Sequence, residues 1–463
     1  MANKDVTDHA RMEKIVSLCK RKGFIFQSAE LYGGLNGCWD YGPLGAELKR
    51  NLKEYWWRKN VQERDDILGL DGSILTHQAV LSASGHVGGF SDPMVDCKVC
   101  KKRYRADQIE EAPVCEKKQQ LPKGEDKTCE LTEPREFNLM FQTSIGASVD
   151  DKDPNAIAYL RPETAQSIFV QYKNVIDSNR VKLPFGIAQI GRSFRNEINP
   201  RNFTFRSREF EQMEVEYFCR AEDGLRLTDE WLETRLKFYE EIGIAREKLH
   251  VLDVADGERA FYSMKTYDIE YEFPFGVQEL EGVAYRTDYD LSVHQKHSGR
   301  PLEYFDDETK EKFIPHVVEP SAGCDRTVLA LICEAYDEED LTKEDGKPDS
   351  RVVMRFDAKM APIKAAVLPL LKNKPELVAK AKEVKCLLQP HMNVFYDEAA
   401  AIGRRYRRQD EVGTPYCIAI DFETLGEEGE DLKDTVTVRE RDSMEQVRMP
   451  ISELLGWLLQ RVR

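Results

Sequence analysis

The sequence has no apolar run long enough to cross a membrane. Hydrophobic residues make up 41% of the 463 residues and charged residues 32%, and no stretch approaches the roughly 20 apolar residues of a spanning helix. Residues 1–20 are polar and lack the apolar centre and the cleavage site of a secretory signal. We therefore expect a folded cytoplasmic protein without a membrane partner, built from roughly two to four domains.

The chain also lacks an excess of positive charge. Lysine and arginine total 67 against 83 aspartate and glutamate residues, a formal net charge of −16, which argues against a protein that coats nucleic acid non-specifically. The basic run at residues 404–408 means that a nucleic acid is still an allowed substrate. On charge alone, this run is interpreted as the solvated face of a helix.

A disulfide framework is also not indicated. The 11 cysteines are odd in number and mostly isolated, unlike those of a small secreted protein. Four of them cluster in the polar, Lys- and Glu-rich stretch at residues 91–135, which reads as an insertion: Cys97, Cys100, Cys115 and Cys129. Their spacing fits either a tetrahedral zinc site or free thiols in a degenerate insertion, because the second half lacks a Cys-x-x-Cys pair.

Hydrophobic spacing divides the chain further. It predicts amphipathic helices at residues 8–22 and after Pro43. Residues 137–336 are mostly strand-like, with a half-buried antiparallel strand predicted at 213–219 and an apolar helix at 327–336. The acidic stretch 337–350 is predicted to be a surface linker.

The last hundred residues follow a different pattern. Strand-length apolar runs at 362–371 and 416–421 and an alternating strand at 435–439 are interspersed with helical segments, predicted at 375–384, 397–409 and 451–462. Alternating strands and helices predict a separate α/β domain.

A charged segment between two strand-like stretches carries the first candidate site. It contains Phe194-Arg195-Asn196-Glu197 and Phe205-Arg206-Ser207-Arg208-Glu209-Phe210, between strands at 187–190 and 213–219, so we expect a hairpin. There an arginine can fork onto phosphate oxygens, an aromatic ring can stack on a base, and a carboxylate can accept from an exocyclic amine. The residues alone equally allow a charged hairpin with surface ion pairs.

Two further segments favour the nucleotide interpretation. In Glu319-Pro320-Ser321-Ala322-Gly323-Cys324-Asp325-Arg326, a glycine beside an arginine at a strand-to-helix junction allows close backbone approach and aims a guanidinium group at an anion. In Leu160-Arg161-Pro162-Glu163-Thr164-Ala165-Gln166, a carboxylate opens a helix.

In this order, the three segments resemble the signature motifs of class II aminoacyl-tRNA synthetases, and in detail those of the single-chain homodimeric branch that charges glycine. The matching sequence motifs are Trp39-Asp40-Tyr41-Gly42-Pro43-Leu44-Gly45, Arg161-Pro162-Glu163-Thr164-Ala165-Gln166, Tyr285-Arg286-Thr287-Asp288-Tyr289-Asp290-Leu291, Met360-Ala361-Pro362 and Arg439-Glu440-Arg441-Asp442-Ser443-Met444. The resemblance implies an α+β fold: an antiparallel-sheet catalytic domain (1–90 and 136–350), a zinc-ribbon-like insertion (91–135) and a C-terminal α/β anticodon-binding domain (355–463).

The resemblance further implies a reaction: glycine is activated with ATP and magnesium to glycyl-adenylate and transferred to the 3′ end of tRNA(Gly). Arg195 would clamp the α-phosphate, Arg326 the γ-phosphate, and Phe210 would stack on adenine. The implied ATP-binding set is Arg195, Asn196, Glu197, Phe205, Arg206, Phe210, Glu279, Leu280, Gly323 and Arg326, with Arg195, Glu197 and Arg326 as catalytic residues. The implied glycine-binding set is Arg105, Glu163, Glu214, Arg286, Glu319 and Ser321.

Expectations for tRNA are drawn from the C-terminal domain, with candidate contacts at Arg404, Arg405, Arg407, Arg439 and Arg441. Two positions depart from the family pattern. Ala79 stands where a proline is expected in the motif that builds the dimer interface, and Ser167 stands where many relatives have glycine.

Three alternatives remain at this point. The first is a non-charging paralogue, which the presence of Arg195, Glu197 and Arg326 disfavours. The second is a synthetase for another small amino acid, which the glycine-type carboxylates disfavour. The third is a tRNA-binding protein without catalysis, which would not need an ATP-binding constellation.

Overall fold

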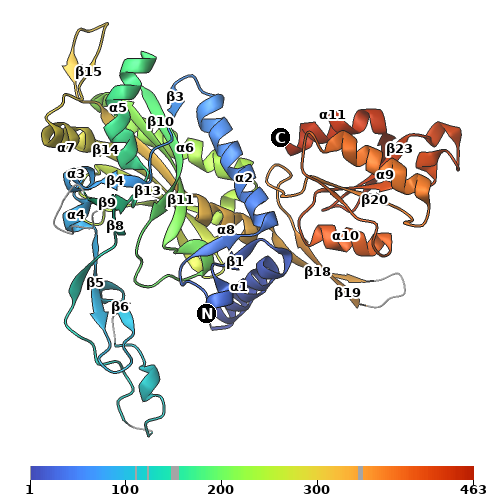
Figure 1. The fold of residues 1–463 in the computed structure, drawn as a ribbon, viewed down its shortest axis with the longest axis horizontal. Coiled ribbons are helices and arrows are strands. Elements are labelled where there is room, and N and C mark those ends of the chain that lie inside the picture. The colour runs from blue at the N-terminus through green and yellow to red at the C-terminus, as the bar shows by residue number, and fades with distance from the viewer. Residues whose placement is uncertain (1, 110–111, 123–124, 147–155, 343–347) are drawn as a thin grey trace.

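The computed structural model describes residues 2–109, 112–122, 125–146, 156–342 and 348–463. Figure 1 shows a larger body, coloured blue to yellow, beside a smaller C-terminal body in orange and red. Two helices near the N-terminus, α1 (Ala2–Lys22) and α2 (Pro43–Trp57), lie on the side of the larger body that faces the smaller one. These helices confirm the predictions at 8–22 and after Pro43.

A seven-stranded sheet forms the centre of the larger body, in the order β12-β13-β14-β17-β11-β10-β3. Neighbouring strands are antiparallel except β10 and β3, which run parallel. The strands are β3 (Ile67–Gly69), β10 (Phe185–Phe194), β11 (Glu209–Cys219), β12 (Leu249–Asp253), β13 (Lys265–Phe273), β14 (Gly276–Thr287) and β17 (His316–Gly323). The predicted hairpin is confirmed, because β10 and β11 pair from Phe185↔Phe218 to Phe194↔Glu209.

Helices cover both faces of this sheet. Helices α1, α2, α6 (Gly224–Glu241) and α8 (Cys324–Ala335) share the main core with one face. Helices α5 (Ala165–Asn179) and α7 (Tyr289–Ser298) pack on the other. The apolar helix predicted at 327–336 therefore exists but begins at Cys324 and ends one residue earlier.

The prediction of a half-buried strand at 213–219 is wrong, because both faces of β11 are covered. Met213, Val215 and Tyr217 pack in the main core, whereas Phe218 packs with α5 and α7. Glu214 is only 1% exposed as a result. The alternation of period two thus separates two buried environments, one apolar and one that holds carboxyl groups.

Smaller elements complete the larger body. They are β1 (Ile25–Gln27), β2 (Trp39–Tyr41), β4 (Leu75–His77), α3 (Gln78–Ala83), α4 (His86–Gly89), β8 (Gln142–Ser144), β9 (Ile157–Leu160), β15 (Tyr304–Phe305) and β16 (Lys312–Phe313). In the stretch read as an insertion, β5 (Ser91–Asp96) pairs with β6 (Arg103–Arg105), and it also pairs with β7 (Arg135–Asn138), which begins at the last residue of that stretch. This sheet extends away from the larger body at the lower left of Figure 1.

The surface linker predicted at 337–350 is instead part of a hairpin. Strands β18 (Tyr336–Thr342) and β19 (Pro348–Met354) pair antiparallel, and residues 343–347 lie outside the described ranges. The acidic composition was misleading because carboxylates of β18 bind arginines that follow them in the chain. Glu339 lies 2.9 Å from Arg351, and Asp337 lies 3.0 Å from Arg355.

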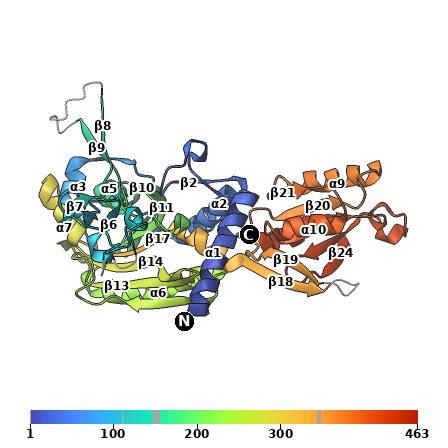
Figure 2. The same ribbon diagram turned by 90° about the horizontal axis from the view of Figure 1, so that it is seen from below.

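The smaller body confirms the predicted α/β domain. Its five strands are ordered β21-β20-β22-β23-β24, and β20 runs parallel to both of its neighbours. The elements are β20 (Ala365–Pro369), α9 (Pro375–Leu388), β21 (Val394–Tyr396), α10 (Ile402–Asp410), β22 (Tyr416–Ile420), β23 (Thr435–Glu440), β24 (Gln446–Pro450) and α11 (Ile451–Val462). In both views the β18–β19 hairpin runs along this body (Figures 1 and 2).

Helix α10 begins five residues later than predicted, because the Asp397 side chain accepts a hydrogen bond from the Ala399 N–H and holds a turn there. Among the described residues, no helix combines the length and apolarity that a membrane crossing requires.

Candidate active site

A cavity of about 390 Å³ lies over the sheet and is lined by all three signature segments. Strands β11, β13, β14 and β17, the loop between β10 and β11 and the segment 254–263 supply most of its lining residues. Of the predicted residues, those lining it are Glu163, Arg195, Glu197, Phe205, Arg206, Phe210, Glu214, Glu279, Leu280, Arg286, Glu319, Ser321, Gly323 and Arg326. Segments more than a hundred residues apart in sequence therefore form a single site.

One corner of the cavity is rich in arginine. The Arg195 guanidinium lies 5.4 Å from the Phe210 ring centroid, and that of Arg326 lies 4.4 Å from the Phe205 ring. Arg326 also contacts the Glu279 carboxylate at 3.2 Å and holds the pKa of that carboxyl group below its ordinary value. Aromatic faces and flat cationic groups at this spacing suit a nucleotide base and its phosphates.

The opposite corner is lined by carboxylates. Glu214 Oε1 accepts a hydrogen bond from Ser321 Oγ at 2.7 Å, and its other oxygen accepts from Thr164 Oγ1. Arg286 donates from Nη1 to Glu319 Oε1 at 2.7 Å. These glutamates are almost fully buried, at 1% and 8% exposed, so their charge is poorly screened by solvent.

The carboxyl groups of this corner are not equivalent. Burial alone would raise the pKa of Glu163, but His86, Arg286 and Gln166 hold it below its ordinary value. Burial, reinforced by Glu319 and Glu163, raises the pKa of Glu214 well above its ordinary value. The pKa of Glu319 is also raised by burial, against the opposing effect of Arg286. Such divergent environments are typical of functional sites.

Arg105 and Asn196 do not line the cavity. The Arg105 side chain binds Asp92 at 2.7 Å on the neighbouring strand, and the Asn196 N–H donates to the Leu139 carbonyl at 2.7 Å. Their predicted substrate contacts remain predictions.

Several residues in or beside the cavity lining were not anticipated from the sequence. The Tyr262 ring centroid lies 4.1 Å from the Arg286 guanidinium. Burial and nearby Glu279 raise the pKa of Asp268, which also lines the cavity, to about 7. His86 Nε2 lies 3.5 Å from Glu163 Oε1. No local sequence motif marks these residues. The strand register places Asp268, the packing of α4 places His86, and the segment between β12 and β13 carries Tyr262.

The two departures from the family pattern have local explanations. The Ala79 N–H donates to His77 Nδ1 at 3.0 Å at the start of α3, and a proline there would have no N–H to donate. The Ser167 hydroxyl donates to the Thr164 carbonyl at 2.8 Å and accepts from Gln189 Nε2 at 2.8 Å. Ser167 is therefore part of the hydrogen-bond network beneath the glutamate corner.

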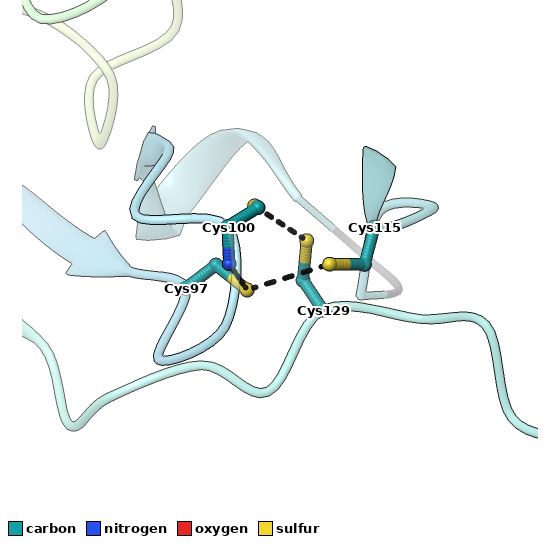
Figure 3. A group of neighbouring side chains, drawn as sticks. All are labelled: Cys97, Cys100, Cys115 and Cys129. Carbon is teal, nitrogen blue, oxygen red and sulfur yellow. Dashed lines mark hydrogen bonds between the residues drawn. The ribbon is translucent and has the colours of Figure 1, made fainter. Parts of the chain in front are cut away.

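The four clustered cysteines converge in the insertion (Figure 3). Cys97 and Cys115 place their Sγ atoms 4.0 Å apart, Cys100 and Cys129 place theirs 3.8 Å apart, and all four lie within 4.8 Å of one another. Thiolates bound tetrahedrally to zinc at about 2.3 Å are separated by about 3.8 Å. The arrangement therefore fits a zinc ion.

The absence of a second Cys-x-x-Cys pair is compensated by backbone pairing. An isolated antiparallel bridge between Val114 and Thr128 aligns the two segments, and the Sγ atoms of Cys115 and Cys129, which flank the bridge, both lie in the cluster. Burial alone would raise the pKa of Cys97, but backbone N–H groups, including that of Cys100, lower it to about 6. A lowered thiol pKa favours the thiolate form that binds metal.

The arginines predicted to contact tRNA differ in accessibility. Arg405, Arg439 and Arg441 are buried, at 1%, 6% and 3% exposed. Arg405 donates to backbone carbonyls of Pro369 and Leu370, and the other two bind groups within the smaller body. The interpretation of the basic run as a uniformly solvated face is thus wrong at Arg405.

The remaining arginines of the basic run lie at or near the surface. Arg404 is exposed on α10. Arg407 binds Asp349 at 2.8 Å, and the exposed Arg408 binds Asp397 at 2.7 Å.

Comparison with known proteins links both bodies to protein families. Residues 148–336 match the tRNA synthetase class II core domain (G, H, P, S and T), and residues 364–461 match an anticodon binding domain. The chain is 50% identical to the glycine–tRNA ligase of Thermobifida fusca over 97% of this chain and 98% of that protein. It is 51% identical to the Treponema denticola glycine–tRNA ligase over 96% of both chains, and 46% identical to that of Thermus thermophilus over 98% of this chain and 99% of that protein.

Proposed function

The chain belongs to the glycine–tRNA ligase family, and on that premise we propose that it activates glycine with ATP and transfers the glycyl group to the 3′ end of tRNA(Gly). One observation carries the site assignment: a single cavity joins an arginine corner to a glutamate corner. ATP enters with magnesium as a substrate. The two corners match the anionic phosphates and the cationic ammonium group of the two small substrates.

The chemistry requires no side-chain nucleophile. An oxygen of the glycine carboxylate attacks the α-phosphorus, and the bond to pyrophosphate breaks. The terminal hydroxyl of tRNA then attacks the carbonyl carbon of glycyl-adenylate, and AMP leaves with the bonding electron pair. Catalysis is therefore positioning together with stabilisation of the charge that develops on the phosphoryl oxygens.

We assign the arginine corner to ATP. Arg195 clamps the α-phosphate, Arg326 holds the γ-phosphate, and Phe210 stacks on adenine. Glu197, Phe205, Arg206, Glu279, Leu280 and Gly323 complete this surface, all of them lining the cavity. Asn196 lies between Arg195 and Glu197, two residues that line the cavity.

We assign the glutamate corner to glycine. The ammonium group has three N–H donors and one charge, which Glu163, Glu214 and Glu319 can accept and balance. Ser321 and Arg286 orient Glu214 and Glu319, respectively. A methyl group admitted into a loose pocket changes binding by only about 1–3 kcal/mol. A wall that forces a β-carbon to clash or to leave a carboxylate unpaired discriminates more strongly.

Amino-acid-dependent exchange of pyrophosphate into ATP tests the proposal. Exchange with glycine alone supports it. A paralogue without catalysis would show no exchange, and a synthetase of different specificity would exchange with proline, serine or threonine instead. Either of those two results would refute the proposal.

For tRNA, the accessible surface favours Arg404 and Arg408 as phosphate contacts of the smaller body, with Arg407 beside them. Arg405, Arg439 and Arg441 act as internal supports that position this surface. Alanine at Arg404 should weaken tRNA binding and lower its salt dependence by about one charge. The matched substitution at Arg461, exposed at the end of α11, should leave both unchanged.

We propose that Cys97, Cys100, Cys115 and Cys129 hold a structural zinc ion, on the strength of their convergence. Metal analysis of the purified chain should find about one zinc per chain, lost in Cys115→Ser and retained in Cys386→Ser, whose cysteine is exposed on α9. Zinc-free wild type would show that these are free thiols.

Three further features complete the proposal. The chain acts as a homodimer in the cytoplasm, and a solution mass of one 53.4 kDa chain would contradict the dimer. Its domains are the catalytic domain (1–90 and 136–350), the insertion (91–135) and the anticodon-binding domain (355–463).

A further inference from the structure

Glu216 is a buried carboxyl group that the proposed reaction does not use. It lies on β11 two residues beyond Glu214, so both side chains project from the same face of the strand. Its exposure is 0%. Neither of its carboxylate oxygens has a hydrogen-bond partner among the described residues, whereas both oxygens of Glu214 are hydrogen-bonded.

The sheet register places this group against the glycine corner. The pairs Glu214↔Ser321 and Tyr217↔Val318 set Glu216 opposite Glu319 on β17. Carboxylate oxygens of Glu214, Glu216 and Glu319 lie within 4.8 Å of one another. Glu216 does not line the cavity itself, and so it lies behind the two glutamates that do.

The arginine beside this cluster, Arg286, already pairs with other carboxylates. Arg286 donates from Nε and Nη2 to Asp290 at 2.8 and 3.0 Å, and from Nη1 to Glu319 at 2.7 Å. Like charges directly opposite on paired strands are destabilising, and two buried carboxylates in contact cannot both ionise freely. Burial and neighbouring Glu319 accordingly raise the pKa of Glu216 well above its ordinary value.

We propose that Glu216 carries a proton while the glycine pocket is empty and loses it to solvent when the ammonium group of glycine enters. One positive charge then replaces another: the ammonium group contacts Glu214 and Glu319, and the proton on Glu216 behind them is released. Glu216 is thus a positioning residue that acts through Glu214 and Glu319. The inference rests on the proposed function, because it takes the glutamate corner as the ammonium site.

The effect of Glu216 on proton release must be distinguished from that of the other titratable or charged groups that face this cluster. They are Glu163 and His86 at the turn before α5 and on α4, Arg286 on β14, Asp290 and His294 on α7, Tyr262 beside Arg286, and Glu214 and Glu319 themselves. Burial lowers the pKa of His294, which favours its neutral form. His86, whose ring lies 3.5 Å from the Glu163 carboxylate, is therefore the residue chosen for the control variant.

The experiment measures proton release when glycine binds. Glycine is titrated calorimetrically into the full chain at one pH near 7, in phosphate and in Tris, whose ionisation heats differ. Wild type should release about one proton per glycine, and Glu216→Gln, which resembles the protonated form in shape, should release about none. In pyrophosphate exchange, the wild-type KM for glycine should rise up to about tenfold per pH unit of acidification, and the Glu216→Gln profile should be flat.

His86→Gln is the matched control and should retain the wild-type proton count. Loss of proton release in His86→Gln but not in Glu216→Gln would overturn the inference. An absence of proton release in the wild-type protein would also overturn it, and that measurement does not depend on whether any variant folds. A KM that follows the choice of sodium or potassium instead of pH would also overturn it, because the cluster would then hold a metal cation. Absence of glycine-dependent exchange in wild type would instead refute the proposed function, so the two failures are distinguishable.

Discussion

Two buried ionic clusters in this protein differ in how completely their charges are paired. In the C-terminal body, Asp410 accepts from Arg351 Nε at 2.9 Å and from Arg439 Nη1 at 2.9 Å. In the cavity, Glu214, Glu216 and Glu319 crowd together around one arginine that also serves Asp290. The paired cluster holds a domain junction together, whereas the incompletely paired cluster is open to a cationic ligand.

The largest expected effect is a loss of stability when the paired cluster is broken. Asp410→Asn removes the charge that two buried guanidinium groups share, and loss of one partner of a buried ion pair costs about 3–5 kcal/mol. The unfolding midpoint in denaturant should fall accordingly, while the KM for glycine stays unchanged. Glu445→Gln, in an exposed loop of the same body, should leave stability intact. A stable Asp410→Asn protein would show that the junction does not depend on this pair.

A smaller effect is expected at the incompletely paired cluster. Glu319→Gln removes one acceptor and one negative charge from the proposed ammonium site, so glycine-dependent exchange should fall by roughly 30- to 100-fold, or about 2–3 kcal/mol. Stability should fall little, because an amide oxygen at position 319 can still accept from Arg286 and Arg286 keeps both of its hydrogen bonds to Asp290. Glu230→Gln on the exposed face of α6 provides the control. Unchanged exchange in Glu319→Gln would remove this residue from the glycine site.

The smallest effect concerns pH and stability. Because the pKa of Glu216 is raised in the folded state, the folded chain binds more protons than the unfolded chain above the ordinary carboxyl pKa, and unfolding becomes easier as pH rises. Glu216→Gln has no such group, so its thermal midpoint should exceed that of wild type by more at pH 8 than at pH 5. A pH-independent difference would mean that Glu216 is ionised in the fold.

The sequence was most informative where local pattern and chemistry agree. The β10–β11 hairpin, the helices at both ends and the strand-to-helix junction at Gly323 all follow from periodicity and turn residues. The pattern could not reveal which strand lies opposite which, so the juxtaposition of Glu216 and Glu319 was not foreseeable. Composition also misled at residues 337–350, where acidic residues indicated a loop but form ion pairs in a hairpin.

Tertiary contacts also determine whether a charged side chain is accessible to a ligand. Arg404 and Arg405 are adjacent in sequence and chemically identical, yet one is exposed and the other is buried against backbone carbonyls. Helical periodicity places them about 100° apart, but only the tertiary structure determines which side faces the sheet.

The assignment of the two corners is tested most directly by a crystal structure with a non-hydrolysable analogue of glycyl-adenylate. The ammonium nitrogen should lie within about 3.2 Å of carboxylate oxygens from at least two of Glu163, Glu214 and Glu319, with the adenine on Phe210. An ammonium group directed away from these glutamates, or an analogue bound outside this cavity, would contradict the account.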